Sequence, residues 1–368
     1  MWKITEEMIE AIAIGAGILG TGGGGNPYIG MLRLRSLLQE GRTVQVVSPA
    51  ELPEDALVVI CAGIGAPTVG VEKLEQGHEG LWALRGLERE MGRKVTAVIS
   101  AEIGGANSIE PMVVSALAGL PVVDGDGMGR AFPEVQMVTF FIYGVSPVPG
   151  ILCDEKGNQV VIRHALDAVS VERFARAVTI QMGCTATMAS SPMTAVEVQG
   201  TAVPYTLSLV RAVGEAVLAA RRTHTDPIEA ILEVTGGTVL FRGKIVDVER
   251  RTVTGFARGE VNIEGLDADR GQQLNVRFQN ENLIAVRDGQ VIACVPDLIC
   301  IVDRETGEPV TTELLRFGQR VAVLGIPCAS LLRQPEALPV VGPAAFGYDD
   351  VTYQPLPGEM PLRPRYGS

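Results

Sequence analysis

Short apolar runs alternate with amphipathic segments through the first half of the chain. The run 56–62 is apolar at every position, and 96–100 is apolar at its centre. Such runs are typical of strands buried on both faces, and their alternation with helical segments predicts a parallel sheet covered by helices. The predicted strands are 44–48, 56–62, 96–100, 120–124 and 136–143, and the predicted helices are 6–14, 28–40, 71–91 and 110–118.

The pattern changes in the second half. Three helical segments come first, at 171–182, 204–221 and 226–234, and short strand-like segments follow at roughly ten-residue spacing. The pair Asp288-Gly289 is a hairpin signal between two of them. We therefore predict an α/β N-terminal domain with a mostly parallel sheet, plus a largely β C-terminal domain with a few helices. The predicted domains are 1–167 and 168–368, and the predicted C-terminal strands are 239–242, 244–254, 259–263, 273–278, 283–286, 291–293, 298–302 and 320–325.

Composition narrows the function classes. The net charge is −12 at pH 7, which disfavours general nucleic-acid binding and attachment to anionic membranes. No apolar window is long and uncharged enough for a transmembrane helix, and no signal peptide is recognisable. The six cysteines form no C-x-x-C pair, which is typical of a reducing compartment. We expect a cytoplasmic protein that binds a small molecule, with neither nucleic acid nor membrane as partner, and that forms a homo-oligomer.

Residues 15–27 contain seven glycines among thirteen residues and precede a predicted helix. Glycines let backbone N–H groups approach a ligand closely, and a helix N-terminus adds unpaired donors. The segment matches G-x-G-x-x-G, but it lacks the preceding strand of a dinucleotide site and the lysine of a phosphate loop. A flexible linker is the alternative. The expected substrate-binding residues are Thr21, Gly22, Gly23, Gly24 and Asn26.

Residues 124–134 are the densest polar segment. They follow a predicted strand, where ligands bind in open α/β sheets. Asp124, Asp126 and Glu134 are candidate catalytic groups, and Arg130 is a candidate substrate-binding group. The spacing does not fit a calcium-binding EF-hand loop. A structural turn with ordinary caps and salt bridges is the alternative.

Two more predicted strands end in glycine-rich polar loops. Glu102 follows strand 96–100 as a candidate acid or base, and Thr68 follows strand 56–62 as a candidate binding residue. Three such strand ends together predict one cleft.

Cys184 lies in a predicted loop beside Gly183 and Thr185, and is a candidate nucleophile. A structural cysteine is the alternative. The three histidines show no zinc-site spacing, so no cofactor is indicated, and a divalent metal stays an open alternative.

These motifs make the chain resemble the S-methyl thiohydantoin desulfurase family. The resemblance implies two domains and attack on a five-membered cyclic ureide or thioureide, with loss of thiol. One departure is Ala344, where the family more often has a basic residue that would contact an anionic substrate tail. The resemblance rests on residues 21–24, 65–69, 124–134, 255–256, 279–282, 296–299 and 341–348.

We therefore expect a hydrolase or desulfurase of the thiohydantoin type, which releases thiol or sulfide or opens the ring. Asp126 or Glu102 would be the general base, Arg130 would orient a substrate carboxylate, and water or Cys184 would attack. A non-catalytic protein that binds a small anion in the same cleft is the alternative. A subunit of an ATP-dependent hydantoinase or oxoprolinase is disfavoured because the phosphate-loop lysine is missing.

Overall fold

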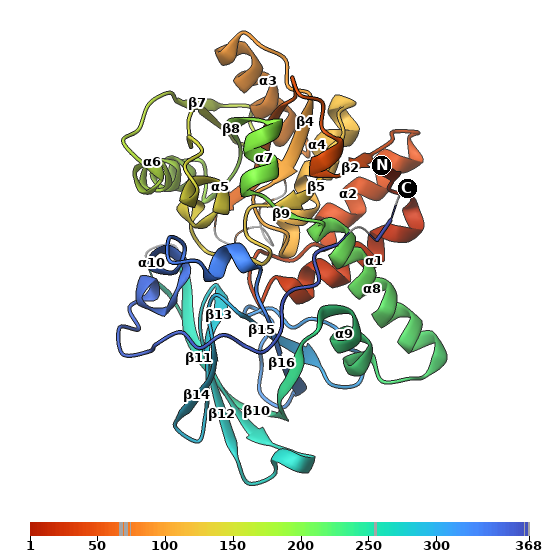
Figure 1. Cartoon of the computed structure of the whole chain (residues 1–368), viewed down its shortest axis with the longest axis vertical. Coiled ribbons are helices and arrows are strands. Elements are labelled where there is room, and N and C mark those ends of the chain that lie inside the picture. The colour runs from red at the N-terminus through yellow and green to blue at the C-terminus, as the bar shows by residue number, and fades with distance from the viewer. Residues whose placement is uncertain (66–68, 70–72, 74, 254–255, 364, 367–368) are drawn as a thin grey trace.

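Two sheets organise the chain, one in each half of the molecule as drawn in Figure 1. The computed structural model describes residues 1–65, 69, 73, 75–253, 256–363 and 365–366. The first sheet has helices packed around it, and the second is a curled antiparallel sheet (Figure 1). The predicted fold class, an α/β domain followed by a largely β domain with few helices, is confirmed.

The first sheet has the strand order β1-β2-β5-β4-β3-β8-β6-β7, and β9 pairs with β5. Its centre, β2-β5-β4-β3, is parallel, and the pairs outside that centre are antiparallel. Strands β8 and β9 belong to this sheet although they follow residue 167. The strands are β1 (Trp2–Lys3), β2 (Gln45–Val47), β3 (Leu57–Gly65), β4 (Ala97–Ser100), β5 (Val122–Asp126), β6 (Gly150–Cys153), β7 (Gln159–Ile162), β8 (Thr185–Thr194) and β9 (Val203–Pro204).

Helices surround this sheet and link it to the second one. They are spread over both parts of the chain, and no helix among the described residues is both long and apolar enough to cross a membrane. The helices are α1 (Glu6–Leu19), α2 (Tyr28–Gln39), α3 (Glu79–Met91), α4 (Glu110–Ala118), α5 (Thr139–Ile142), α6 (Ala168–Gln181), α7 (Ala195–Thr201), α8 (Thr206–Thr223), α9 (Pro227–Thr235) and α10 (Leu338–Val341).

The second sheet is antiparallel throughout, with the order β14-β13-β12-β11-β10-β16-β15. It encloses a core that includes Phe241, Val276 and Phe278. Asp288 and Gly289 both have positive φ in the β13–β14 hairpin, as predicted. The strands are β10 (Thr238–Val253), β11 (Phe256–Gly265), β12 (Gln273–Gln279), β13 (Glu281–Arg287), β14 (Gln290–Cys294), β15 (Leu298–Asp303) and β16 (Arg320–Ile326).

The predicted strand 136–143 is wrong. The segment forms the 3-10 helix η4 (Val135–Met137) and the short helix α5. Phe140 is fully buried there, and Thr139 donates its N–H to the Gly127 carbonyl. A short apolar run fits a buried helical turn as well as a strand, so periodicity alone does not separate the two.

The first two glycines of segment 15–27 lie inside α1 rather than in a loop. A Cβ on Gly15 would come within 1.9 Å of the Val210 carbonyl oxygen on α8. A Cβ on Gly214 of α8 would come within 1.8 Å of the Ala11 carbonyl oxygen on α1. These glycines let α1 and α8 pack side by side (Figure 1), and the glycine-rich loop begins only at Gly20.

That loop joins the two domains. Asn282 of β13 donates its N–H to the Thr21 carbonyl at 2.8 Å, and Thr312 donates its N–H to the Gly22 carbonyl at 2.8 Å. The loop therefore holds residues of the second sheet against the end of the first sheet.

Candidate functional site

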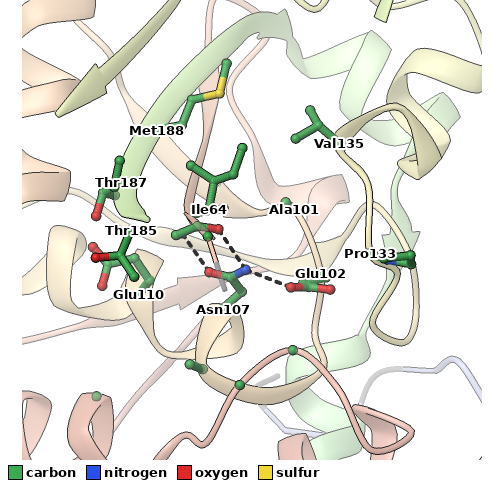
Figure 2. A pocket seen from close by; sticks show the side chains of 18 of the residues that line it. Ile64, Ala101, Glu102, Asn107, Glu110, Pro133, Val135, Thr185, Thr187 and Met188 are labelled. Carbon is green, nitrogen blue, oxygen red and sulfur yellow. Dashed lines mark hydrogen bonds between the residues drawn. The ribbon is translucent and has the colours of Figure 1, made fainter. Parts of the chain in front are cut away.

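A pocket of about 440 Å³ opens where β3 and β4 of the parallel sheet end. Residues of the glycine-rich loop, of β8 and of the second domain complete its lining. In Figure 2, Met188, Ile64 and Val135 lie along one side, and Glu110, Asn107 and Glu102 lie along the other. The pocket therefore has an apolar wall opposite a row of polar side chains.

Glu102 lies two residues beyond the end of β4 and is almost completely buried. Its Oε1 accepts a hydrogen bond from Asn107 Nδ2 at 2.7 Å, and its Oε2 accepts one from Phe132 N at 3.1 Å. Burial raises the pKa of Glu102 to about 7, although these two donors act in the opposite direction. A carboxyl with this pKa can both accept and give a proton near neutral pH.

Asn107 fixes the position of Glu102. It belongs to the 3-10 helix η3 (Gly105–Ser108), and its Oδ1 accepts the Gly63 N–H at 2.7 Å. Its Nδ2 also donates to the Gly63 carbonyl at 3.1 Å. These contacts tie the end of β3 to the carboxyl beyond β4, as the dashed lines in Figure 2 show.

Glu281 enters the pocket from the second domain. It is the first residue of β13, and its Oε1 accepts the Gly24 N–H at 3.2 Å. Its buried Oε2 has no hydrogen-bond partner among the described residues. Burial, and then the nearby Glu102, raise the pKa of Glu281 well above its ordinary value, and Arg130 acts in the opposite direction. Burial and the nearby Glu102 therefore both favour the protonated, neutral form of Glu281.

The glycine loop makes room for this carboxyl. A Cβ on Gly23 would lie 2.0 Å from Glu281 Oε1, so a side chain there would displace the acid. Gly24 and Asn26 line the pocket. Asn26 Oδ1 accepts the N–H of Tyr28 at 2.9 Å.

Glu110, the first residue of α4, is a third acid in the pocket lining. Burial and then Glu75 raise its pKa to about 7, and Arg33 acts in the opposite direction. No hydrogen bond or ion pair joins Glu110 to another side chain in the part of the chain that the structure describes.

The candidate acids of segment 124–134 lie outside this lining. Asp126 is fully buried, and its Oδ2 accepts three backbone N–H groups, from Ile103, Met128 and Gly129, at 2.8–2.9 Å. Burial raises its pKa to about 7. Asp124 accepts from the Ser208 N–H at 2.9 Å and so holds the first turn of α8. Both side chains are engaged in holding the backbone.

Glu134 is half-buried, and it accepts a hydrogen bond from Gln136 rather than facing the pocket.

Arg130 is also fully buried and outside the lining. Its Nη2 donates to Thr21 Oγ1 at 2.9 Å and its Nη1 to the Asp297 carbonyl at 2.8 Å. It also donates to the carbonyls of Ala131, Asn282 and Pro296, and its guanidinium lies 4.6 Å from the ring centroid of Phe132. These contacts join the two domains and seat Phe132 in the pocket wall.

The remaining candidates, three for binding and the candidate nucleophile Cys184, do not gather at one place. Thr21 is buried with its hydroxyl on Arg130, and the Gly22 carbonyl is held by Thr312. Cys184 is half-buried, has a φ of 68° and follows α6, and only its neighbour Thr185 lines the pocket. Thr68 lies outside the described residues.

Among the residues that the structure describes, no three His, Cys, Asp or Glu side chains gather as a metal site would require.

Sequence reasoning missed Glu281, Glu110 and Asn107. Glu281 has a local signal, because the polar residues 279–282 interrupt two apolar strands. Glu110 and Asn107 carry no such signal, since an acid at the start of a helix and an asparagine before one are common caps.

Comparisons with known proteins agree with this architecture. A solved crystal structure of a protein from Chromobacterium violaceum is 25% identical to this chain, with a TM-score of 0.82 over 96% of this chain and 100% of that one. No curated protein matches the chain. Residues 7–164 match the family model described as S-Me-THD-like, N-terminal domain, and residues 166–356 match S-Me-THD-like, C-terminal domain. The chain therefore belongs to the S-Me-THD-like family, the S-methyl thiohydantoin desulfurase family that its motifs resemble.

Proposed function

We propose that the pocket is the active site of a hydrolase that acts on a small five-membered cyclic ureide or thioureide, such as an S-methyl thiohydantoin. The observation that carries this proposal is that Glu102, Glu110 and Glu281 line one pocket with raised pKa values. General acid–base catalysis needs carboxyl groups whose pKa values are raised toward neutral pH, and such groups lie here at the edge of an apolar cavity. The family assignment supports the substrate class.

The two carboxyls from different domains divide the proton transfers. Glu102 takes a proton from water as the water oxygen bonds to the ring carbon that carries the S-methyl group. Glu281 gives its proton to the adjacent ring nitrogen, which receives the electron pair of the C=N bond. The C–S bond then breaks, Glu102 returns its proton to the departing thiol, and the new hydroxyl returns a proton to Glu281. A hydantoin and methanethiol result, and both acids regain their first state.

In this proposal water rather than Cys184 attacks, since Cys184 is outside the pocket lining. Asp126 and Arg130 act as positioning residues through the backbone at Ile103 and through Phe132. The loop N–H of Gly24 holds Glu281 in place rather than an oxyanion.

The rival function, binding of a small anion without catalysis, is not favoured, because four acids line the cavity: Glu75, Glu102, Glu110 and Glu281. We also propose a reducing, cytoplasmic setting, since all six cysteines are free thiols.

The test is release of thiol from S-methyl thiohydantoins by the purified protein, followed with a thiol reagent and by detection of the hydantoin. Glu281→Gln should lower turnover by about a hundredfold or more, the usual scale of general acid–base help. Glu264→Gln, at an exposed position of β11, is the matched control. Ring opening without thiol release would show that the protein is not a desulfurase but a ring-opening hydrolase. Full activity of Glu281→Gln would show that Glu281 takes no part in the reaction.

A further inference from the structure

The larger part of the pocket wall is apolar. Phe132, Val135, Val138 and Phe141 come from the segment after β5, and Ile64 and Met188 come from β3 and β8. Val135, Ile64 and Met188 face the acids across the cavity in Figure 2. If Glu102 and Glu281 hold the ring, the rest of the pocket, with this apolar wall and with Glu110 opposite it, is left for the ring substituent.

Three cations also reach the lining, and each already has a carboxylate partner. Arg33 Nη1 lies 3.1 Å from Glu75 Oε2, Lys73 Nζ lies 2.6 Å from Glu155 Oε2, and Arg176 Nε lies 2.7 Å from Glu172 Oε1. Lys73 Nζ also donates to the carbonyls of Met182 and Thr185, and Arg176 donates to that of Pro133. Among the described residues of the lining, no cation is left to neutralise a carboxylate on a ligand.

Apart from Glu75, which pairs with Arg33, the acids of the lining have no ion-pair partner among the described residues. Glu110 makes no ion pair with the described residues, and Glu102 and Glu281 bind only uncharged donors directly. A carboxylate placed among them would lose its hydration, and above a pH of about 7 it would meet like charge on ionised Glu102 and Glu110. Both effects oppose binding. An apolar group would instead gain from burial against the opposite wall.

We propose that this pocket takes five-membered rings that carry an uncharged apolar substituent and rejects rings that carry a carboxylate tail, and that Glu110 is a residue that enforces this choice. The inference rests on the proposed function and names the substrate class within it.

The experiment compares two rings of similar reach, one with a 5-benzyl and one with a 5-(2-carboxyethyl) substituent. Binding of the two hydantoins is measured by calorimetry, and kcat/KM is measured for the two S-methyl thiohydantoins. The benzyl ring should be preferred on the order of tenfold or more, the scale of an unfavourable like-charge contact. Because calorimetry needs no turnover, failure of the reaction and failure of the selectivity are distinguishable.

Glu110→Gln should narrow the preference severalfold by improving binding of the carboxyethyl ring, while Glu264→Gln leaves the ratio as it is. Equal or tighter binding of the carboxyethyl ring by the unaltered protein would overturn the inference, as would binding of neither ring. An unchanged ratio in Glu110→Gln would remove Glu110 from the selection.

Discussion

Two sets of buried acids lie close together in this molecule, and they differ in what their oxygens contact. Asp126 Oδ2 accepts three backbone N–H groups in a closed cradle. Glu281, by contrast, accepts only one N–H, on Oε1. One oxygen of each acid, Asp126 Oδ1 and Glu281 Oε2, has no partner among the described residues, but only Glu281 lines the pocket. Burial raises the pKa in both cases. We propose on this ground that, of these two acids with a raised pKa, only Glu281, which lines the cavity, takes part in the reaction.

The largest expected effect concerns stability at the cradle. Asp126→Ala leaves three buried N–H groups without an acceptor, so the free energy of unfolding should fall by about 3 kcal/mol or more. Denaturant unfolding measures this change. Asp126→Asn keeps an acceptor oxygen and should lose clearly less. If the two variants lose the same free energy of unfolding, acceptance of the three backbone N–H groups is not the way in which Asp126 stabilises the protein.

The next effect concerns the cavity side. Gly23→Ala places a Cβ 2.0 Å from Glu281 Oε1 and should displace that carboxyl. Misplacement of a reacting group by about 1 Å costs on the order of a hundredfold in turnover. Gly200→Ala is the control, because a Cβ there meets nothing within 4 Å. Normal turnover by a folded Gly23→Ala protein would break the link between the loop and Glu281.

The smallest effect concerns the support of Glu102. Asn107→Ala removes a donor that lowers the pKa of Glu102, so the midpoint of the pH–rate profile should move to higher pH. Turnover near neutral pH should fall about tenfold, within the range of one lost positioning contact. Asn158→Ala breaks a similar contact to Asp154 outside the pocket and should leave the profile in place. If the midpoint of the pH–rate profile is unchanged in Asn107→Ala, Asn107 does not set the pKa of Glu102.

The sequence predicted the sheet and helices well where burial produces a simple pattern. The runs at 56–62 and 96–100 are central strands because strands covered on both faces are apolar throughout. Strand β8 was missed because Thr, Ser and Ala dominate it, and small residues give no apolar signal.

The candidate site was predicted in part. Glu102 and Gly24 line the pocket that the strand ends predicted, whereas Asp124, Asp126 and Arg130 lie outside it. A high density of polar residues in a segment does not reveal whether their side chains will bind a ligand or backbone groups of the protein itself. Glu281 comes from the other domain and lies 179 positions after Glu102 in the sequence. Only the packing of the two domains brings these acids together.

The pH profile of kcat/KM for thiol release, in the unaltered protein and in Glu102→Gln, tests the central claim most directly. A base with its pKa raised to about 7 is active once ionised, so kcat/KM should rise with pH through about 7. It should fall again where Glu281 loses its proton, a step that burial and the nearby Glu102 move to higher pH by raising the pKa of Glu281. Glu102→Gln should lose the rising limb and about a hundredfold of the rate. A rising limb that survives unchanged in a folded Glu102→Gln protein would contradict the account.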